Sequence, residues 1–368
     1  MQTIDHTYRT LYSELAQRSL DDQFTTEFSL DGRFISQEVK GRRYWYFDTA
    51  KADGGKSRQY VGPVDDEAIT SRVERFKDLK ADYRARRKIV STLVREAYYP
   101  QPEALAGDIV EALASAGFFR LRGVLIGTVA FQAYTAILGV RLSNTIMQTG
   151  DADFAQFHSI SVAVEDAIPP VLDVLRAVDE TFREVPHQAD SRRSTQFRAR
   201  SGYKVEFLTP NTGSAEYDGQ PAVMPALGGA AAQPLRFLDF LIHQPVRAVL
   251  LHGAGIPVLV PAPERFAVHK LIVGSRRRID DDGTAKAAKD RLQAITLMEA
   301  MIAVRQGLAL ADAYMEAWDR GPAWREAILE SLASLATERW EPVRMVVAEY
   351  VTRIGGRPGD YGLDPHAA

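Results

Sequence analysis

The sequence predicts an α+β protein: a small mixed or antiparallel sheet core, a helical bundle after it, and a β-hairpin with helices before it. Three observations carry this prediction. Between residues 102 and 210 the order is helix, strand, helix, strand, helix, strand, strand, unlike a βαβ repeat. From Pro263 to Arg353 almost every segment has helical periodicity. Residues 43–62 are rich in aromatic and β-branched residues around a Gly-Gly turn.

The N-terminal extension contains two predicted helices and the hairpin. Residues 4–20 have helical apolar spacing. GRRYWYFD and RQYVG flank the turn KADGGKS, whose glycines supply the positive φ that a hairpin tip needs. A long charged helix is expected between Pro63 and Pro100. The aromatic and basic residues of the hairpin suit a nucleic-acid platform or an apolar contact equally well.

The sheet core follows. A short apolar strand ends at Gly127-Thr128, a single helix (VAFQAYTAILGV) stops at Gly139, and a long strand runs from Met147 through GDADF. A Gly/Ala/Pro-rich crossover begins near residue 211, and the elements of 235–260 stay undecided. The expected parts are the extension, the sheet core, the helical bundle and a flexible tail, over residues 1–100, 101–260, 261–355 and 356–368.

Composition and charge narrow the function classes. The chain has no cysteines, which excludes disulfides, cysteine-ligated metal centres and a cysteine nucleophile. No stretch reaches the about 18 consecutive apolar residues of a membrane span, and the N-terminal segment has no signal-peptide core. We therefore expect a cytoplasmic protein with no membrane partner. The net charge of −3 argues against a general nucleic-acid binder, since such proteins need a basic excess.

Two aspartates in one predicted strand carry the chemical argument. Asp151 and Asp153 are two residues apart, so their carboxylates project from the same face of the strand. Adjacent carboxylates repel each other unless a divalent cation that prefers oxygen ligands lies between them. Gly127 and Thr128, where a strand gives way to a helix, offer free backbone N–H groups that suit a phosphate. Phosphoryl or nucleotidyl transfer requires both kinds of site.

A third carboxylate, Glu206, lies in the strand segment YKVEFLTP, with Val205 and Phe207 on the opposite face. If this strand pairs beside the strand of Asp151 and Asp153, all three acids reach the same cations. A pair of bridged metal ions would then let Glu206 contact the second ion and the attacking oxygen.

The order of these motifs resembles the DNA polymerase beta-type nucleotidyltransferase superfamily: an apolar strand, Gly-Thr, a helix, Asp-x-Asp and a later strand with one acid. More narrowly, Arg141 followed by Thr149-Gly150-Asp151-Ala152-Asp153-Phe154 is similar to AbiEii-like stand-alone bacterial nucleotidyltransferases. The resemblance covers residues from about 120 to 300 and leaves out the N-terminal hairpin. Two positions depart from the usual pattern, since Thr128 replaces the commoner Ser and Glu206 the commoner Asp. Both keep the hydroxyl or the carboxylate.

The resemblance implies further residues for the triphosphate. A lysine and then a basic residue beside an aspartate follow on helices in that family, and they match Lys270 and Lys289-Asp290 here. Each has a simpler alternative: Lys270 could extend from an apolar helix toward water, and Lys289 could form a surface pair. Arg141 could bind phosphate or cap the helix that ends near Gly139.

The sequence leaves the roles of several other basic residues and of the histidines undecided. Arg198 and Arg200 alternate in a predicted strand before Glu206, so both would share one face near the site, where an acceptor or the triphosphate would pass. The run Arg276–Arg278, after the Lys270 helix, could likewise contact an acceptor or the triphosphate. The histidines lack the spacing of a zinc site and are expected to be structural; the three considered are His158, His252 and His269.

The predicted function is a metal-dependent nucleotidyltransferase that moves a nucleoside monophosphate from an NTP to an acceptor hydroxyl with release of pyrophosphate. Asp151, Asp153 and Glu206 would be the catalytic residues and metal ligands, for two Mg²⁺ ions or for Mn²⁺. Gly127, Thr128, Arg141, Lys270 and Lys289 would bind the nucleotide phosphates. RNA (such as a tRNA end) or protein is slightly favoured over a small molecule as the acceptor. A toxin-like role follows from the resemblance alone.

Two rival hypotheses keep the same fold. The protein could be a non-catalytic nucleotide sensor or interaction module that binds NTP without turnover. It could also be a hydrolase that uses the same acids and releases inorganic phosphate. An oligomer is compatible with the sequence.

Overall fold

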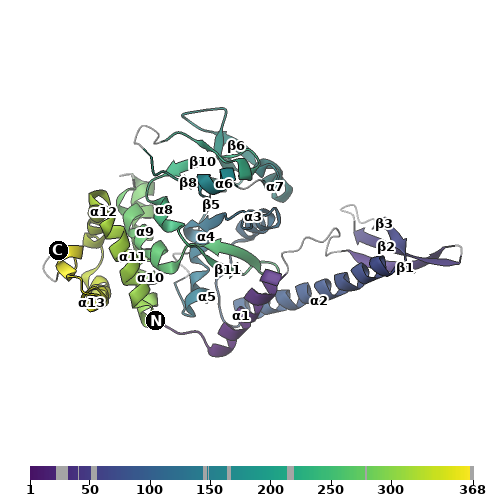
Figure 1. Ribbon diagram of the computed structural model, residues 1–368, viewed down its shortest axis with the longest axis horizontal. Coiled ribbons are helices and arrows are strands. Elements are labelled where there is room, and N and C mark those ends of the chain that lie inside the picture. Colours follow the sequence, from purple (N-terminus) through teal and green to yellow (C-terminus); the bar gives the residue numbers. More distant parts are fainter. Residues whose placement is uncertain are drawn as a thin grey trace.

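The computed structural model describes residues 1–21, 32–39, 41–50, 56–143, 147, 149–163, 167–213, 219–277 and 280–364. The fold is α+β, as predicted, with a body that holds the main sheet and the C-terminal helices and an arm that extends away from it (Figure 1). Within those ranges, no helix combines the length and apolar character that a membrane span requires.

The arm is a three-stranded antiparallel sheet packed on helix α2 (Glu67–Arg95). Its strands are β1 (Arg33–Val39), β2 (Arg42–Ala50) and β3 (Lys56–Pro63). The predicted hairpin is β2 paired with β3. Its Gly-Gly tip, within residues 51–55, lies outside the described residues. The predicted long charged helix is α2, which begins a few residues after β3.

Three phenylalanines give the arm a small core of its own. The ring centroids of Phe34 and Phe76 are 5.0 Å apart, and those of Phe47 and Phe76 are 5.7 Å apart. Trp45 Nε1 donates a hydrogen bond to Thr70 Oγ1 at 2.9 Å. Edge-to-face ring contacts of this kind stabilise a sheet on a helix where little other apolar area is available.

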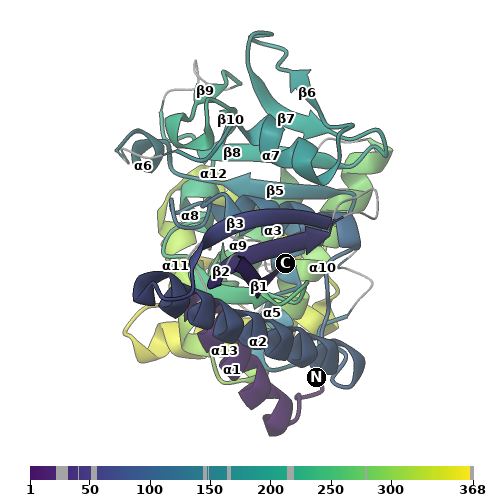
Figure 2. The same ribbon diagram turned by 90° about the vertical axis from the view of Figure 1, so that its right-hand side faces the viewer.

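The other end of α2 joins the arm to the body. Leu15 of α1 (His6–Asp21) and Leu93 of α2 are fully buried in one cluster with Val249 of β11 (Val246–Leu250). β11 pairs antiparallel with β12 (Ile256–Val260). Seen from the side of the arm, α1 and α2 cross the lower part of the body and the main sheet lies above them (Figure 2).

The main sheet is mixed and has seven strands in the described part of the chain. Its centre is parallel, with β5 (Asp151–Ala155) next to β8 (Lys204–Pro210) and β8 next to β10 (Ala231–Leu235). Four antiparallel strands complete it: β4 (Val124–Ile126) on β5, β7 (Ser194–Arg198) on β8, β6 (Arg183–Pro186) on β7 and β9 (Ala222–Val223) on β10.

One face of this sheet is apolar and buried. Phe154 of β5 and Phe207 of β8 have ring centroids 5.6 Å apart, and Phe118 lies 5.3 Å from Phe154. Phe197 of β7 extends the group, 6.0 Å from Phe207. All four side chains are fully buried. Because side chains alternate along a strand, the opposite face of the same strands is left for polar residues.

Helices surround the sheet and continue into the C-terminal bundle. Near the sheet are α3 (Ala104–Ser115), α4 (Gly127–Phe131), α5 (Tyr134–Leu138), α6 (His158–Ala163), α7 (Val171–Val178) and α8 (Leu238–Leu241), with the 3₁₀ turn Pro225–Leu227. The bundle contains α9 (Pro263–Ser275), α10 (Asp281–Ala303), α11 (Gly307–Asp319), α12 (Pro322–Ala333) and α13 (Thr337–Arg353), followed by the 3₁₀ turn Pro358–Tyr361.

Helix α9 is the centre of the bundle, since it packs against α10, α11 and α12 and is buried along most of its length. One continuous hydrophobic cluster extends from α3 to α13, so the sheet and the bundle share an interior. The domain boundaries expected from the sequence stay predictions.

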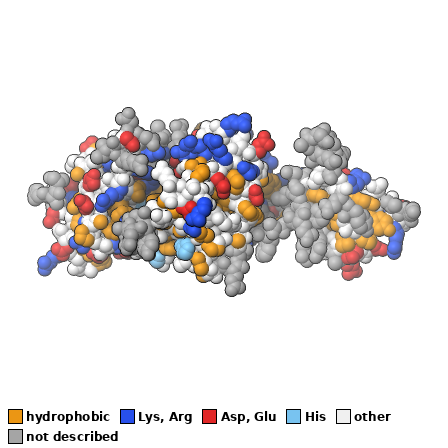
Figure 3. Space-filling model, turned by 90° about the horizontal axis from the view of Figure 1, so that it is seen from above, with side chains coloured by type: hydrophobic (Ala, Val, Ile, Leu, Met, Phe, Trp, Pro, Cys, Tyr) orange, Lys and Arg blue, Asp and Glu red, His pale blue; other side chains and the backbone are white. Residues whose placement is uncertain are grey.

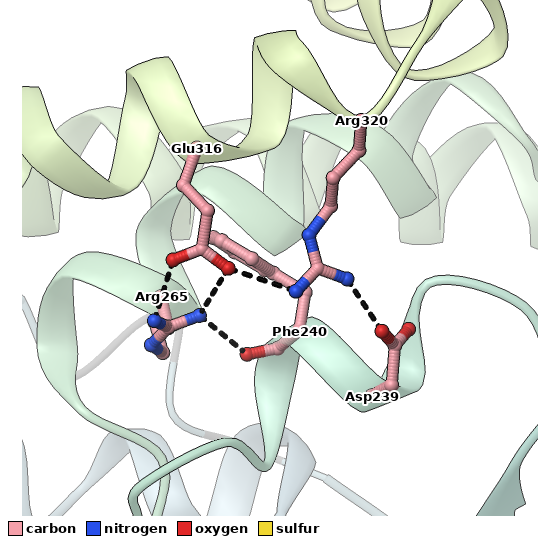
Figure 4. Close-up of polar contacts among 5 residues, drawn as sticks. All are labelled: Asp239, Phe240, Arg265, Glu316 and Arg320. Atoms are coloured by element: carbon pink, nitrogen blue, oxygen red, sulfur yellow. Dashed lines mark hydrogen bonds and ion pairs between the residues drawn. The ribbon is translucent and has the colours of Figure 1, made fainter.

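A polar network ties the sheet side to the bundle (Figure 4). Arg265 of α9 donates to both carboxylate oxygens of Glu316 on α11, at 2.6 and 3.2 Å, and to the carbonyl oxygen of Phe240. Arg320 donates to Glu316 at 2.8 Å and to Asp239 of α8. Both guanidinium groups also lie over the Phe240 ring. The network holds α8, α9 and α11 in fixed relative positions.

Some predicted elements were wrong in extent. The single helix expected up to Gly139 is two short helices, α4 and α5, and at the break Gln132 Nε2 donates to the carbonyl oxygen of Met147 at 3.1 Å. The long strand expected after Met147 is only β5, and α6 follows, where the Ser161 hydroxyl accepts a hydrogen bond from Ala226 N at 3.0 Å. The undecided segment 235–260 contains α8, β11 and β12.

The stacked rings make a stability prediction. Phe207→Ala removes a fully buried ring and leaves a cavity, so we expect a loss of about 3–5 kcal/mol in the free energy of unfolding. Chemical denaturation followed by circular dichroism measures it. Leu292→Ala on the exposed side of α10 is the control, with an expected change below about 0.5 kcal/mol. Equal losses in both variants would contradict this description of the core.

Candidate active site

The three predicted acids lie on one face of the main sheet. β5 and β8 are parallel neighbours, and their register places Asp153 opposite Glu206 and Asp151 opposite Lys204. Paired residues in neighbouring strands point to the same side, so the carboxylates share the polar face. All three are half-buried, whereas Ala152 and Val205 between them face the core. The pairing of the two strands, which the sequence argument required, is present.

Gly127 lies directly against Asp153. β4 pairs with β5 so that Ile126 is opposite Asp153, and α4 starts at the next residue. Gly127 has a φ of +68°, and a Cβ atom there would be 2.5 Å from Asp153 Oδ2. Both the left-handed backbone and the close approach therefore require glycine. The start of α4, with Thr128 half-buried beside Gly127, is thus brought to the carboxylates as predicted.

Two hydrogen bonds orient the acids, and the sequence argument assigned neither donor. The Thr149 hydroxyl donates to Asp151 Oδ1, and Gln196 Nε2 donates to Glu206 Oε1. Each bond leaves the second carboxylate oxygen available. Thr149 belongs to the motif that carries the resemblance. Gln196 could have been found from its alternation with buried Phe197 on β7, but only if β7 was known to pair with β8.

The electrostatics of Asp153 reflect this crowding. Burial, together with the nearby charges of Asp151 and Glu206, raises the pKa of Asp153 from 3.8 to about 8, while Lys270 and Arg277 oppose the rise. A cation that enters the site would therefore stabilise the ionised form of Asp153. Tyr203, which the sequence argument also missed, is buried near the same acids. Burial and the Asp151 and Asp153 charges raise its pKa, so its phenol stays protonated.

Helices α9 and α10 supply cations on this side of the sheet. Lys270 Nζ lies 2.5 Å from Asp290 Oδ1, and Arg277 Nη2 lies 2.8 Å from Asp290 Oδ2. Lys270 is buried and also lies over the Phe266 ring at 5.3 Å. Burial and the Lys270 charge lower the pKa of Lys289, while the acids at the site act in the opposite direction. The two predicted lysines are thus both brought into the field of the acids.

The contacts of the remaining basic candidates, Arg141 and Arg276, are with residues other than the three acids. The guanidinium of Arg141 lies over the Tyr98 ring at 5.2 Å, and its backbone N donates to the carbonyl oxygen of Gln2 at 2.9 Å. Its phosphate role stays a prediction. Arg276 lies 3.5 Å from Glu326, and residue 278 lies outside the described residues.

The predicted alternation of Arg198 and Arg200 on one strand was wrong. β7 ends at Arg198 because the chain turns, and Ala199 N donates to the carbonyl oxygen of Tyr203 at 3.0 Å. Arg200 lies exposed in that turn, where its backbone N donates to Thr181 Oγ1 at 3.0 Å. Of the two arginines, Arg198 alone remains in the strand that pairs with the Glu206 strand.

The donor set fits magnesium. Three carboxylates on one face offer the oxygen ligands that Mg²⁺ and Mn²⁺ prefer, and the raised pKa of Asp153 reflects the excess negative charge that a cation would neutralise. The acids would have to approach more closely to share ions. Among the described residues, another group, on α3 and near β11, is the only one whose potential ligand atoms all lie within 4.8 Å of one another, and the three acids of β5 and β8 do not meet that distance.

That other group consists of Asp108 and Glu111 of α3 with His252 in the turn between β11 and β12. His252 Nε2 and Asp108 Oδ1 are 2.8 Å apart, so the structure places this histidine among potential metal ligands, and the structural role expected for it stays a prediction. Arg86 and Arg87 of α2 contribute to the field at Glu111. The acids of β5 and β8 instead face cations from α9 and α10, so the two clusters are separate.

The comparisons agree with this geometry. A family model described as nucleotidyltransferase matches residues 104–319, more than half of the chain and the whole span from α3 through α11. The chain therefore belongs to this nucleotidyltransferase family. No curated protein and no solved structure matches it. The narrower resemblance to AbiEii-like proteins stays a prediction.

The raised pKa of Asp153 gives a prediction on pH and metal. The folded protein holds this proton more tightly than the unfolded chain does, so without metal its stability should fall as pH rises from about 4 to about 8. Asp153→Asn should flatten this part of the profile and raise the Tm near pH 8. Mg²⁺ should raise the Tm of the wild type there and have little effect on Asp153→Asn.

Thermal unfolding in EDTA and in Mg²⁺ measures both effects. Asp108→Asn, in the cluster on α3, is the matched control and should keep the response to Mg²⁺. If Asp108→Asn loses that response while Asp153→Asn keeps it, magnesium binds on α3 and not at β5.

Proposed function

We propose that the protein transfers a nucleoside monophosphate from an NTP to an acceptor hydroxyl and releases pyrophosphate. The observation that carries this proposal is the opposition of Asp153 and Glu206 on parallel strands, with Asp151 on the same face and Gly127 against Asp153. Membership of the family supports nucleotidyl transfer in general. The use of metal, the release of pyrophosphate and the acceptor belong to the proposal.

The three acids have distinct roles in this scheme. Asp151 and Asp153 would hold two Mg²⁺ ions, with Mn²⁺ as an alternative, and Glu206 would hold the one nearer the acceptor. When bound, such ions stabilise the negative charge on the phosphoryl group during transfer. Glu206 receives the proton of the acceptor hydroxyl, while Gln196 keeps its carboxylate oriented. Thr149 does the same for Asp151.

The triphosphate would lie between α4 and the lysines. The backbone N–H groups around Gly127 and Thr128 face it from one side, and Lys270 and Lys289 from the other. The lowered pKa of Lys289 comes partly from the Lys270 charge, and phosphate oxygens between the two would relieve that repulsion. Lys270 pairs with Asp290 of α10, and Lys289 precedes that aspartate on the same helix and lies in the field of Asp151 and Asp153. Arg141 stays an untested part of this group.

The central test is transfer of label. The protein is incubated with each α-labelled NTP, Mg²⁺, total cellular RNA and total cellular protein, and the products are separated on gels. We expect label in one macromolecular class, reduced by roughly two orders of magnitude or more in Asp153→Asn and Glu206→Gln. Asp312→Asn, an exposed acid on α11, is the control with unchanged transfer.

Other outcomes of this test separate the rival functions. NTP binding without any product, surviving in Glu206→Gln, would favour the nucleotide sensor. Release of inorganic phosphate in place of pyrophosphate would favour a hydrolase. Label in a small molecule would keep the transferase and change its acceptor. The cytoplasmic location, the toxin-like role and an oligomeric state stay predictions.

Lys289 gives a separate prediction on the nucleotide. Lys289→Gln should raise the Kd for NTP about tenfold, because it removes one charge-assisted phosphate contact. Lys286→Gln, an exposed lysine one turn earlier on α10, is the matched control and should leave the Kd unchanged. Isothermal titration with a non-hydrolysable NTP analogue measures both. Equal affinities for the two variants would remove Lys289 from the phosphate site.

A further inference from the structure

A row of cations continues the face that carries the acids. The strand registers place Asp151 opposite Lys204, Lys204 opposite Arg198 and Arg198 opposite Arg183. These residues lie on β5, β8, β7 and β6 in that order. Residues paired in this way point to the same side of a sheet, so the four side chains form one line across it. We call Lys204, Arg198 and Arg183 the cationic row.

The cationic row has no acidic partner among the described residues. In that part of the chain none of the three forms an ion pair or a side-chain hydrogen bond, and Arg198 Nε is a buried atom with no hydrogen-bond partner. In contrast, several arginines in the bundle each form an ion pair with a carboxylate: Arg265, Arg320, Arg339 and Arg344. A buried donor without a partner costs stability, and a ligand that supplies an oxygen removes that cost.

The cationic row leads from the site to the surface. Lys204 and Arg198 are half-buried, and Arg183 at the far strand is exposed. Lys and Arg side chains gather on the face seen from above, over the region where β6 and β10 are labelled in Figure 1 (Figure 3). With strands about 4.8 Å apart, the line from Asp151 to Arg183 spans about 14 Å.

The order of the strands assigns this side to the acceptor. Gly127 precedes α4 and lies on the β4 side of Asp153, while Glu206 lies on the β8 side. In an in-line displacement the attacking oxygen and the leaving pyrophosphate are on opposite sides of the α-phosphorus. If pyrophosphate leaves toward Gly127, the acceptor approaches over β8, β7 and β6, which is along the cationic row.

We propose that the acceptor is a nucleic acid strand whose backbone phosphates lie along Lys204, Arg198 and Arg183, with its terminal hydroxyl at Glu206. This inference rests on the proposed function. The terminal hydroxyl oxygen forms a bond to the α-phosphorus, its proton passes to the Glu206 carboxylate, and the bond to pyrophosphate breaks. The strand grows by one nucleotide and pyrophosphate leaves.

The length and regularity of the cationic row favour this class of acceptor. A nucleic acid strand presents one negative charge at every nucleotide and can contact several cations in succession. A small hydroxyl compound lacks the series of negative charges that would match three cations in succession. With a net charge of −3 the chain has no overall basic excess, so attraction for a polyanion depends on local groups of cations such as this row.

Direct binding tests the inference on the full-length chain. A fluorescein-labelled single-stranded RNA of about 12 nucleotides is titrated at low salt and followed by anisotropy, with NTP omitted. Arg183→Gln and Arg198→Gln should each weaken binding roughly three- to tenfold and lower the log–log salt slope by about 0.7. Arg247→Gln, an exposed arginine on β11, removes the same charge elsewhere and should leave the affinity unchanged.

Several results would overturn the inference. Unchanged RNA affinity in Arg183→Gln, whose side chain is exposed and whose fold is not at risk, is one of them. An equal loss in Arg247→Gln is another, because it would indicate non-specific attraction. Label transfer to protein or to a small molecule, unaffected by the row variants, would refute the nucleic acid acceptor and keep the transferase. RNA binding that depends on the cationic row without any transfer would support the inference and refute the proposed function.

Discussion

The opposition of Asp153 and Glu206 across two parallel strands, with Asp151 two residues away, places like charges where they repel each other. Neighbouring residues reduce that repulsion or leave room for the acids. Thr149 and Gln196 each donate a hydrogen bond to one acid, and glycine rather than a larger residue stands against Asp153. The raised pKa of Asp153 indicates that these contacts leave part of the charge unbalanced, which is the free energy that a bound cation would recover.

Strands β4 and β5 carry no lysine or arginine, and the bundle supplies further cations to the acids. Lys270, Arg277 and Lys289 come from α9, α10 and the loop between them, so their positions depend on how α9 sits on the sheet. The shared hydrophobic interior and the network of Arg265 and Arg320 with α8 and α11 determine that placement. Asp290, buried between Lys270 and Arg277, then keeps these two cations from repelling each other.

The sequence predicted the acids and the glycine because both depend on local rules. Alternation along a strand puts Asp151 and Asp153 on one face, and a glycine between strand and helix indicates a special backbone. Strand neighbours depend on the whole topology, so Gln196 was not foreseen as the partner of Glu206.

The end of β7 was also missed, because a turn over the next four residues overrides the β-pattern that would have put Arg198 and Arg200 on one face of the strand. The break between α4 and α5 was missed for a similar reason: the Gln132 contact joins residues far apart in the local pattern.

The distribution of charge across the polar face would keep the two proposed substrates apart. Two groups of cations lie near the acids, which we call the two flanks: Lys270 and Lys289 on the bundle helices α9 and α10, and Lys204 and Arg198 on strands β8 and β7. A triphosphate and a polyanionic acceptor that both lay on one flank would repel each other near the reacting phosphorus. Two flanks separate these anions and leave the acids as the point where they meet. A protein that only sensed nucleotides would need the first flank, so the cationic row is the feature of this face that nucleotide binding alone leaves unexplained.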